Sequence, residues 1–81
     1  MLHPDLATLL QQRKETIADH AFRDRDPAAH LEELKSVSES ITAWHEARRG
    51  TLPARLEHFL TGCSFDKALR FLESDGTWSG H

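Results

Sequence analysis

Apolar side chains recur at helical spacing through the first fifty residues of the chain. Intervals of three and four residues join one set between positions 27 and 49, namely Leu34, Val37, Ile41 and Trp44, with Leu31 alongside. A second, interrupted set between positions 4 and 23 consists of Leu6, Leu9, Leu10, Ile17 and Ala21. Such spacing gathers apolar side chains on one helix face, so the pattern predicts amphipathic helices from about 4 to 23 and from about 27 to 49.

The segment 23–27, Arg-Asp-Arg-Asp-Pro, separates these two helices. Asp26 can accept hydrogen bonds from the free amides of a new helix, and Pro27 has a backbone angle suited to the first helical position. Because proline disfavours helical geometry in the residue before it, the first helix must end before Asp26. So short a break predicts an antiparallel hairpin, in which Leu6 approaches Trp44.

Two shorter helices are expected to pack on this hairpin. The apolar positions that mark them are Leu52, Leu56, Phe59 and Leu60 over about 52–61, and Phe65, Ala68, Leu69 and Leu72 over about 64–74. Gly62 is expected to close the first of them, and Ser64 to cap the second. The sequence therefore predicts an all-α domain over residues 1–75 and a flexible tail over 76–81.

Arg13 interrupts the apolar face of the first helix. In an antiparallel hairpin it falls near Val37 and Ser38, at a level where both helices turn polar. We expect Arg13 to pair there with Glu39, or to border a small polar niche.

The small size of the chain predicts a thin margin of stability. A chain of 81 residues buries only about 60–65% of the surface that its unfolded form exposes. Sharing apolar surface between chains adds burial, so we expect an antiparallel homodimer that involves Trp44. Trp78, a large aromatic side chain in the tail, is a second candidate anchor for a partner.

The charge pattern argues against nucleic acid as a partner. Ten basic and thirteen acidic residues are interleaved, with a net charge of -3, whereas phosphate-binding domains concentrate basic residues on one face. The one basic cluster is Arg48, Arg49 and Arg55, and we interpret it as a solvated helix end or an interaction surface. The alternative hypothesis is a regulatory nucleic-acid-binding protein that uses this cluster together with Arg70.

No metal site is predicted, although the chain contains six histidines. No Glu is followed three residues later by His, and no two His lie four residues apart, so the helical ligand patterns are absent. The best remaining cluster, Asp19 and His20 with Asp24 and Asp26, is explained by helix caps and surface charges. The isolated glycines likewise offer no phosphate-binding loop, and we predict no cofactor.

Catalysis is not predicted either. The lone Cys63 has His58 and His45 as candidate bases, but no spacing rule brings either to the thiol. We expect Cys63 to pack as a small hydrophobe. A helix-turn-helix over the two short helices is disfavoured because Glu57 and His58 occupy positions that should be apolar or small.

The chain begins without a leader-like segment and contains no apolar run near 18 residues, which predicts a protein that does not enter a membrane. A single cysteine suits a reducing compartment, so we expect a cytoplasmic location. Together the patterns predict a small helical interaction or oligomerisation module without catalytic activity, which binds itself or another protein.

Overall fold

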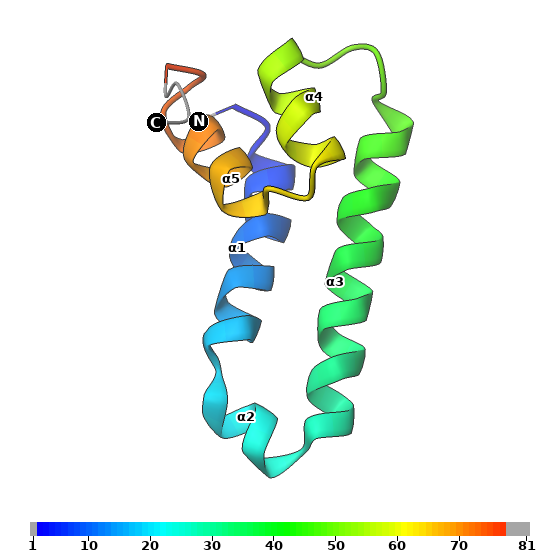
Figure 1. Ribbon diagram of the computed structural model, residues 1–81, viewed down its shortest axis with the longest axis vertical. Helices are drawn as coiled ribbons and strands as arrows, with labels where there is room; N and C mark the ends of the chain where they lie inside the picture. Colours follow the sequence, from blue (N-terminus) through cyan, green and yellow to red (C-terminus); the bar gives the residue numbers. More distant parts are fainter. Residues whose placement is uncertain (1, 78–81) are drawn as a thin grey trace.

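Within residues 2–77, which the computed structural model describes, the chain forms five helices and no strand. Two long helices, α1 (Pro4–Ala18) and α3 (Pro27–Ala47), form an antiparallel hairpin, and the short α2 (His20–Arg25) closes its tip (Figure 1). The helices α4 (Ala54–Thr61) and α5 (Phe65–Glu73) lie at the opposite end. The prediction of an all-α hairpin packed by two short helices is confirmed.

The helix α3 begins where the turn predicted. The carboxylate of Asp26 accepts a hydrogen bond from the backbone N–H of Ala29 at 3.1 Å, and Pro27 is the first helical residue. At its other end α3 stops at Ala47, and Gly50 adopts a φ of +85° in the turn that follows. Because glycine takes up this left-handed geometry without steric cost, Gly50 can redirect the chain toward α4.

The first helix does not run unbroken to Arg23, so that prediction was wrong. It ends at Ala18, and Asp19 leaves helical geometry with a φ of -83° and a ψ of 78°. The carboxylate of Asp19 accepts a hydrogen bond from the N–H of Phe22 at 3.1 Å and so starts α2 as a second N-cap. Aspartate competes well for backbone amides, and here this local cap replaces the next turn of α1.

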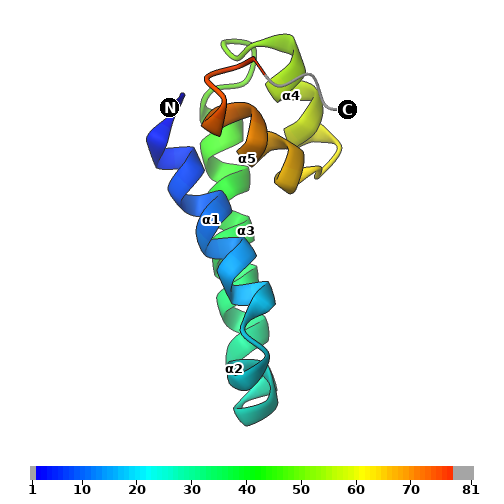
Figure 2. The same cartoon turned by 90° about the vertical axis from the view of Figure 1, so that its left-hand side faces the viewer.

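Two hydrogen bonds between the long helices set their register. At the end near α4, the indole N–H of Trp44 donates to Oδ2 of Asp5 at 2.7 Å. Near the tip, Nε2 of His30 donates to the backbone carbonyl of Thr16 at 2.7 Å. This register agrees with the antiparallel alignment expected from the turn, and Figure 2 shows the hairpin edge-on with α1 in front of α3.

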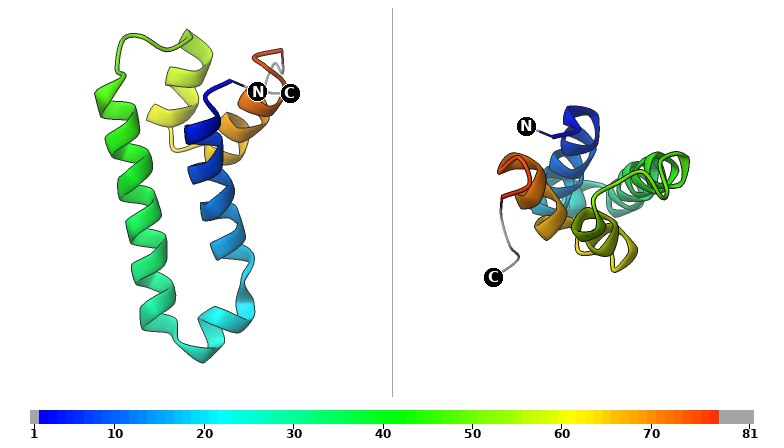
Figure 3. Two further views of the ribbon diagram at one scale, coloured as in Figure 1. Left: turned by 180° about the vertical axis from the view of Figure 1, so that it is seen from behind. Right: turned by 90° about the horizontal axis from the view of Figure 1, so that it is seen from above.

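The helices α4 and α5, which we call the lid, lie on one side of the plane through α1 and α3 (Figure 3, right). They begin and end within two residues of the predicted bounds. The backbone N–H of Leu2 donates to the carbonyl of Leu72 at 3.3 Å and ties the start of the chain to α5. The lid therefore covers one face of the hairpin at the end where the chain begins.

The hydrophobic core is confined to the lid end. Its buried side chains are Leu6, Ala7, Leu10, Val37, Ile41, Trp44, Leu56, Phe59, Leu60, Ala68, Leu69, Phe71 and Leu72. On α1 these all precede Gln11, and on α3 they all follow Ser36. Ile17 and Ala21, which the sequence pattern placed in the core, are exposed instead. The apolar face of the hairpin is thus buried over only part of its length.

The turn after α4 places a residue other than glycine in left-handed geometry. Cys63 has a φ of +55°, and the N–H of Ser64 donates back to the carbonyl of Phe59 at 2.8 Å. The sequence pattern assigned this turn to Gly62, whose φ is -84°. Cys63 is exposed, so its predicted packing as a small hydrophobe was wrong, because the residue forms the surface turn that ends α4.

Candidate interaction surface

Beyond the lid the hairpin continues as an arm, residues 14–36, consisting of the last turn of α1, α2 and the first half of α3 (Figure 1). Ile17 is 42% exposed and Leu31 is 66% exposed, and both lie on this arm. Among the described residues they are the large hydrophobic side chains left open to solvent. Isolated exposed leucines are common. Whether these two residues mark a binding surface therefore depends on where they lie relative to the core.

Leu31 continues the face of α3 that the lid covers. His45 marks that face, since its Nε2 lies 2.6 Å from Oε1 of Glu57 on α4. Steps of three and four residues then lead toward the tip through Ile41, Ser38 and Leu34 to Leu31. Residues at this spacing share one side of a helix, so Leu31 and the half-buried Leu34 lie on the lid side of the arm.

Ile17 continues the corresponding face of α1. Leu6, Leu10, Arg13 and Ile17 follow one another at intervals of three and four residues, which keeps them on one side of the helix. The guanidinium carbon of Arg13 lies 4.6 Å from the centre of the Phe65 ring at the start of α5. Arg13 therefore marks the edge of the lid, and Ile17 lies one turn beyond it.

The predicted pairing of Arg13 with Glu39 does not form. The guanidinium of Arg13 stacks on the ring of Phe65, and Glu39 is an exposed residue on α3. A contact of this type is worth about 0.5–1 kcal/mol at exposed sites. The sequence could not reveal it, because Phe65 belongs to a helix more than fifty residues further along the chain.

Basic residues occupy some of the helix-neighbour positions of the exposed apolar side chains. Helix neighbours lie three or four residues apart, and at these distances Ile17 has Arg13 and Lys14, while Leu31 has Lys35. We call these three basic residues the rim. The same distances from Ile17, Leu31 and Leu34 contain no acidic residue. The lid-side surface formed by Ile17, Leu31 and Leu34 within the rim is called the arm face below.

A histidine holds the arm together where the core ends. His30 is only 6% exposed and donates its hydrogen bond to Thr16 on α1. Its ring meets the Phe22 ring edge-on, with 5.4 Å between the centroids. The carbonyl of Thr16 also accepts a hydrogen bond from the backbone N–H of Asp19 at 3.2 Å, so His30 adds a second donor at the break after Ala18. The arm is thus clamped by a polar contact where the lid end has a packed core.

Trp44, which the sequence pattern offered as a shared side chain, lies in the core with 7% of its surface exposed. The His3 ring packs edge-on against the indole at 5.2 Å, and the Arg48 guanidinium lies 4.4 Å from its centre on one face. The indole hydrogen bond lowers the pKa of Asp5, and the nearby Arg48 adds to this effect. Trp44 therefore fastens α1 to α3 within one chain.

Two of the other predicted interaction residues, Arg48 and Arg49, lie against carboxylates. Arg48 stacks on Trp44 and lies 3.6 Å from the carboxylate of Asp5. Arg49 forms an ion pair with Glu46 at 2.6 Å. Arg55 lies in the first turn of α4. Trp78 lies outside the described residues, so its predicted role as an anchor stays a prediction.

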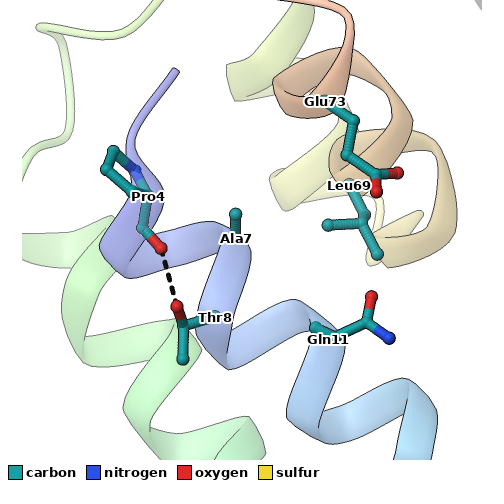
Figure 4. Close-up of a pocket in the computed structure, with 6 residues that line it drawn as sticks. All are labelled: Pro4, Ala7, Thr8, Gln11, Leu69 and Glu73. Carbon is teal, nitrogen blue, oxygen red and sulfur yellow. Dashed lines mark hydrogen bonds between the residues drawn. The ribbon is translucent and has the colours of Figure 1, made fainter. Parts of the chain in front are cut away.

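A groove of about 300 Å³ lies between α1 and α5 (Figure 4). Ala7 and Leu69 give it an apolar floor, and its remaining lining residues are Pro4, Thr8, Gln11 and Glu73. The hydroxyl of Thr8 donates to the carbonyl of Pro4 at 2.9 Å, and the Gln11 amide donates to Glu15 at 3.2 Å. These bonds occupy the Thr8 hydroxyl and the Gln11 amide of the lining.

Cys63 and His45, which the sequence offered as a possible nucleophile and base, have different surroundings in the structure. Cys63 is exposed after α4, while Nε2 of His45 is engaged by Glu57 in the lid interface. Oε2 of Glu57 is buried without a hydrogen-bond partner. Across residues 2–77, no three His, Cys, Asp or Glu side chains are grouped closely enough to hold a metal ion. A search of the same residues finds no helix with the length and apolar character needed to cross a bilayer.

Comparison with known proteins adds no relative. No protein-family model matches the sequence, and neither the curated proteins nor the solved structures with which the chain was compared give a match.

Proposed function

We propose that this protein is a non-catalytic helical interaction module and that the arm face is its docking surface. The observation that carries the proposal is the continuity of the apolar stripes. The faces that bury Leu10 and Ile41 under the lid continue as Ile17 and Leu31, at 42% and 66% exposure, where the lid ends. An apolar helix face without a covering element is the feature that helical partners recognise.

The proposal includes both expected forms of association, a homodimer and a complex with another protein. An arm face of one copy against that of a second would give a two-fold interface. The proposal assigns no role to the basic cluster, because Arg48 and Arg49 already have carboxylate partners. Salt-sensitive binding of DNA that depends on Arg48, Arg49, Arg55 and Arg70 would favour the alternative of a nucleic-acid-binding protein.

The test compares the double variant Ile17→Asp/Leu31→Asp with wild type by light scattering after size exclusion and by capture of binding proteins. We expect the variant to fold and to lose self-association or capture, whichever wild type shows. The matched control, Gln12→Asp/Ala43→Asp, places the same two charges at exposed positions of α1 and α3 away from the arm face. Association that survives the arm variant, or a wild type that binds nothing, contradicts the proposal.

A further inference from the structure

We infer that the contact between His45 and Glu57 makes the docking of α4 depend on pH. The contact holds α4 against α3 while the imidazole of His45 carries a proton, and α4 loosens when that proton is lost. Histidine is the side chain whose charge ordinarily changes near neutral pH. This inference concerns the lid end of the molecule and does not depend on the proposed function of the arm face.

The contact lies where the lid meets α3. Nε2 of His45 is 2.6 Å from Oε1 of Glu57, and His45 is only 7% exposed. So short a distance is typical of hydrogen bonds in which one or both groups are charged. The helix α4 packs closely on α5, and α5 packs on α1. The pair of His45 and Glu57 therefore gives α4 a direct link to α3.

The surroundings of Glu57 make the proton important. Its side chain is 30% exposed as a whole, but Oε2 is buried and has no hydrogen-bond partner. An ionised carboxylate with an unsolvated oxygen is costly unless a positive charge lies beside it. A neutral imidazole donates one hydrogen bond to Glu57, whereas an imidazolium donates the same bond and also balances the charge. The docked α4 should therefore retain the proton of His45 more strongly than the unfolded chain does.

The other charged and titratable groups near His45 have contacts of their own. On α1 and at the end of α3 these groups are Asp5 and Arg48, which lie 3.6 Å apart, Glu46 and Arg49, which pair at 2.6 Å, and His3, whose ring packs on Trp44. In these contacts each carboxylate already has a cation beside it. The charge balance of the His45 imidazole therefore rests on Glu57.

The charged groups of the lid point elsewhere. Arg55 and His58 are exposed, and they lie one or two residues from Glu57, a spacing that turns them to other sides of α4. On α5 the charged residues are all exposed, namely Asp66, Lys67, Arg70 and Glu73. His58 titrates in the same pH range as His45, so it needs a control of its own.

The sign of the effect follows from the charge balance. Because the docked form binds the proton more tightly, the contact stabilises α4 fully in weakly acidic solution and less as the pH rises through the range of histidine titration. A histidine ordinarily loses its proton near about pH 6.5, so the loss should fall between about pH 6 and 8. Below about pH 4, protonation of the carboxylate removes the charge of the partner.

Amide hydrogen exchange of the full chain tests the inference, because it reports the local opening of one helix. Exchange is followed by NMR at about pH 5.5 and about pH 8 and corrected for the intrinsic effect of pH on amide exchange. We expect the protection of the α4 amides, such as those of Phe59 and Leu60, to fall by about tenfold between the two conditions. The amide of Leu10 on α1 should change much less.

Two variants assign the effect to the pair. In Glu57→Gln the side-chain oxygen can still accept the hydrogen bond from a neutral imidazole but has no charge, so the loss of α4 protection with rising pH should disappear. The matched control, His58→Gln, removes the exposed histidine of the same helix and should leave the loss unchanged. A loss that persists in Glu57→Gln, or one that disappears in His58→Gln, contradicts the inference.

A second measurement needs no variant. In an NMR titration of the wild-type histidine rings, His45 should keep its proton to a higher pH than the exposed His58. The inference is overturned if His45 loses its proton first, if α4 is protected equally or better at the higher pH, or if α1 and α3 lose protection as much as α4 does. The variant Ile17→Asp/Leu31→Asp should keep the pH effect on α4, so failure of the docking surface and failure of this inference are distinguishable.

Discussion

The lid end and the arm use the same two long helices but hold them together by different means. At the lid end, Leu10 and Ile41 are 2% and 1% exposed, packed under α4 and α5. In the arm, the side chains that continue these stripes face solvent, and the contact between His30 and Thr16 joins the helices. An apolar stripe therefore gives a helix an inner side, while the core extends only as far as other elements cover that side.

Core truncations should reveal this difference most strongly. Ile41→Ala should lower the free energy of unfolding by about 2–5 kcal/mol, because the lost side chain leaves a cavity. Ile17→Ala should cost less than about 1 kcal/mol, since the side chain is already half in solvent and alanine has the higher helix propensity. Urea denaturation followed by circular dichroism measures both. Equal losses would mean that the arm is packed as firmly as the lid end.

The next largest effect concerns the two caps in the arm. Asp26→Ala should destabilise the protein by about 1 kcal/mol, because the N-cap of α3 is lost. Asp26→Asn is the control, because its amide oxygen can still accept the hydrogen bond from Ala29. Asp19→Ala should cost less, since α2 has only six residues and none is buried. Thermal melts compare the three, and a larger loss from Asp19→Ala would make α2 essential to the hairpin.

A substitution at the lid end should stabilise the protein. Cys63→Gly should raise the free energy of unfolding by roughly 1 kcal/mol, because the left-handed geometry at this turn costs a side chain about that much. Cys63→Ala removes the thiol and keeps the unfavourable geometry, so it should change little. Both are measured by urea denaturation under reducing conditions. A gain in the alanine variant equal to that in the glycine variant would assign the effect to the thiol.

The smallest expected effect is a pH dependence at the lid end. Trp44 lowers the pKa of Asp5 below its usual 3.8 through the indole hydrogen bond. The folded form therefore favours the ionised carboxylate, and this contribution is present above pH 3.8 and is lost as pH falls through the lowered folded value. Trp44→Phe, which removes the donor, should flatten this part of the stability profile. If the free energy of unfolding falls at acid pH in the same way in this variant, the ionisation of Asp5 does not contribute to stability.

Local signals in the sequence were sufficient for much of the fold. Asp26 and Pro27 fixed the start of α3, because a cap and a preset backbone angle act within a few residues. The break at Asp19 was missed, although the aspartate that causes it is of the same type. At this break His30 donates to the carbonyl of Thr16 from fourteen residues away. The spacing of residues within one helix does not indicate a contact of this kind with another helix.

The residues of the candidate site were not among those that the sequence pattern offered. The sequence pattern offered Trp44 as a residue of an interaction surface. In the structure Trp44 is buried and its indole donates a hydrogen bond from α3 to Asp5 on α1. The arm face was hidden because Ile17 and Leu31 have the same spacing as the core residues beside them. Their exposure depends on where α4 and α5 stop, and the apolar period within one helix does not reveal that limit.

The sequence by itself determined the helices, the antiparallel turn and the inner side of each long helix, because these follow from neighbouring residues and from a regular period. The tertiary structure decided which part of that inner side is buried. The lid is shorter than the hairpin that it covers, so its placement at one end leaves the arm face open. Burial depends on contacts between distant segments, and the same apolar period therefore yields a core at one end and an exposed surface at the other.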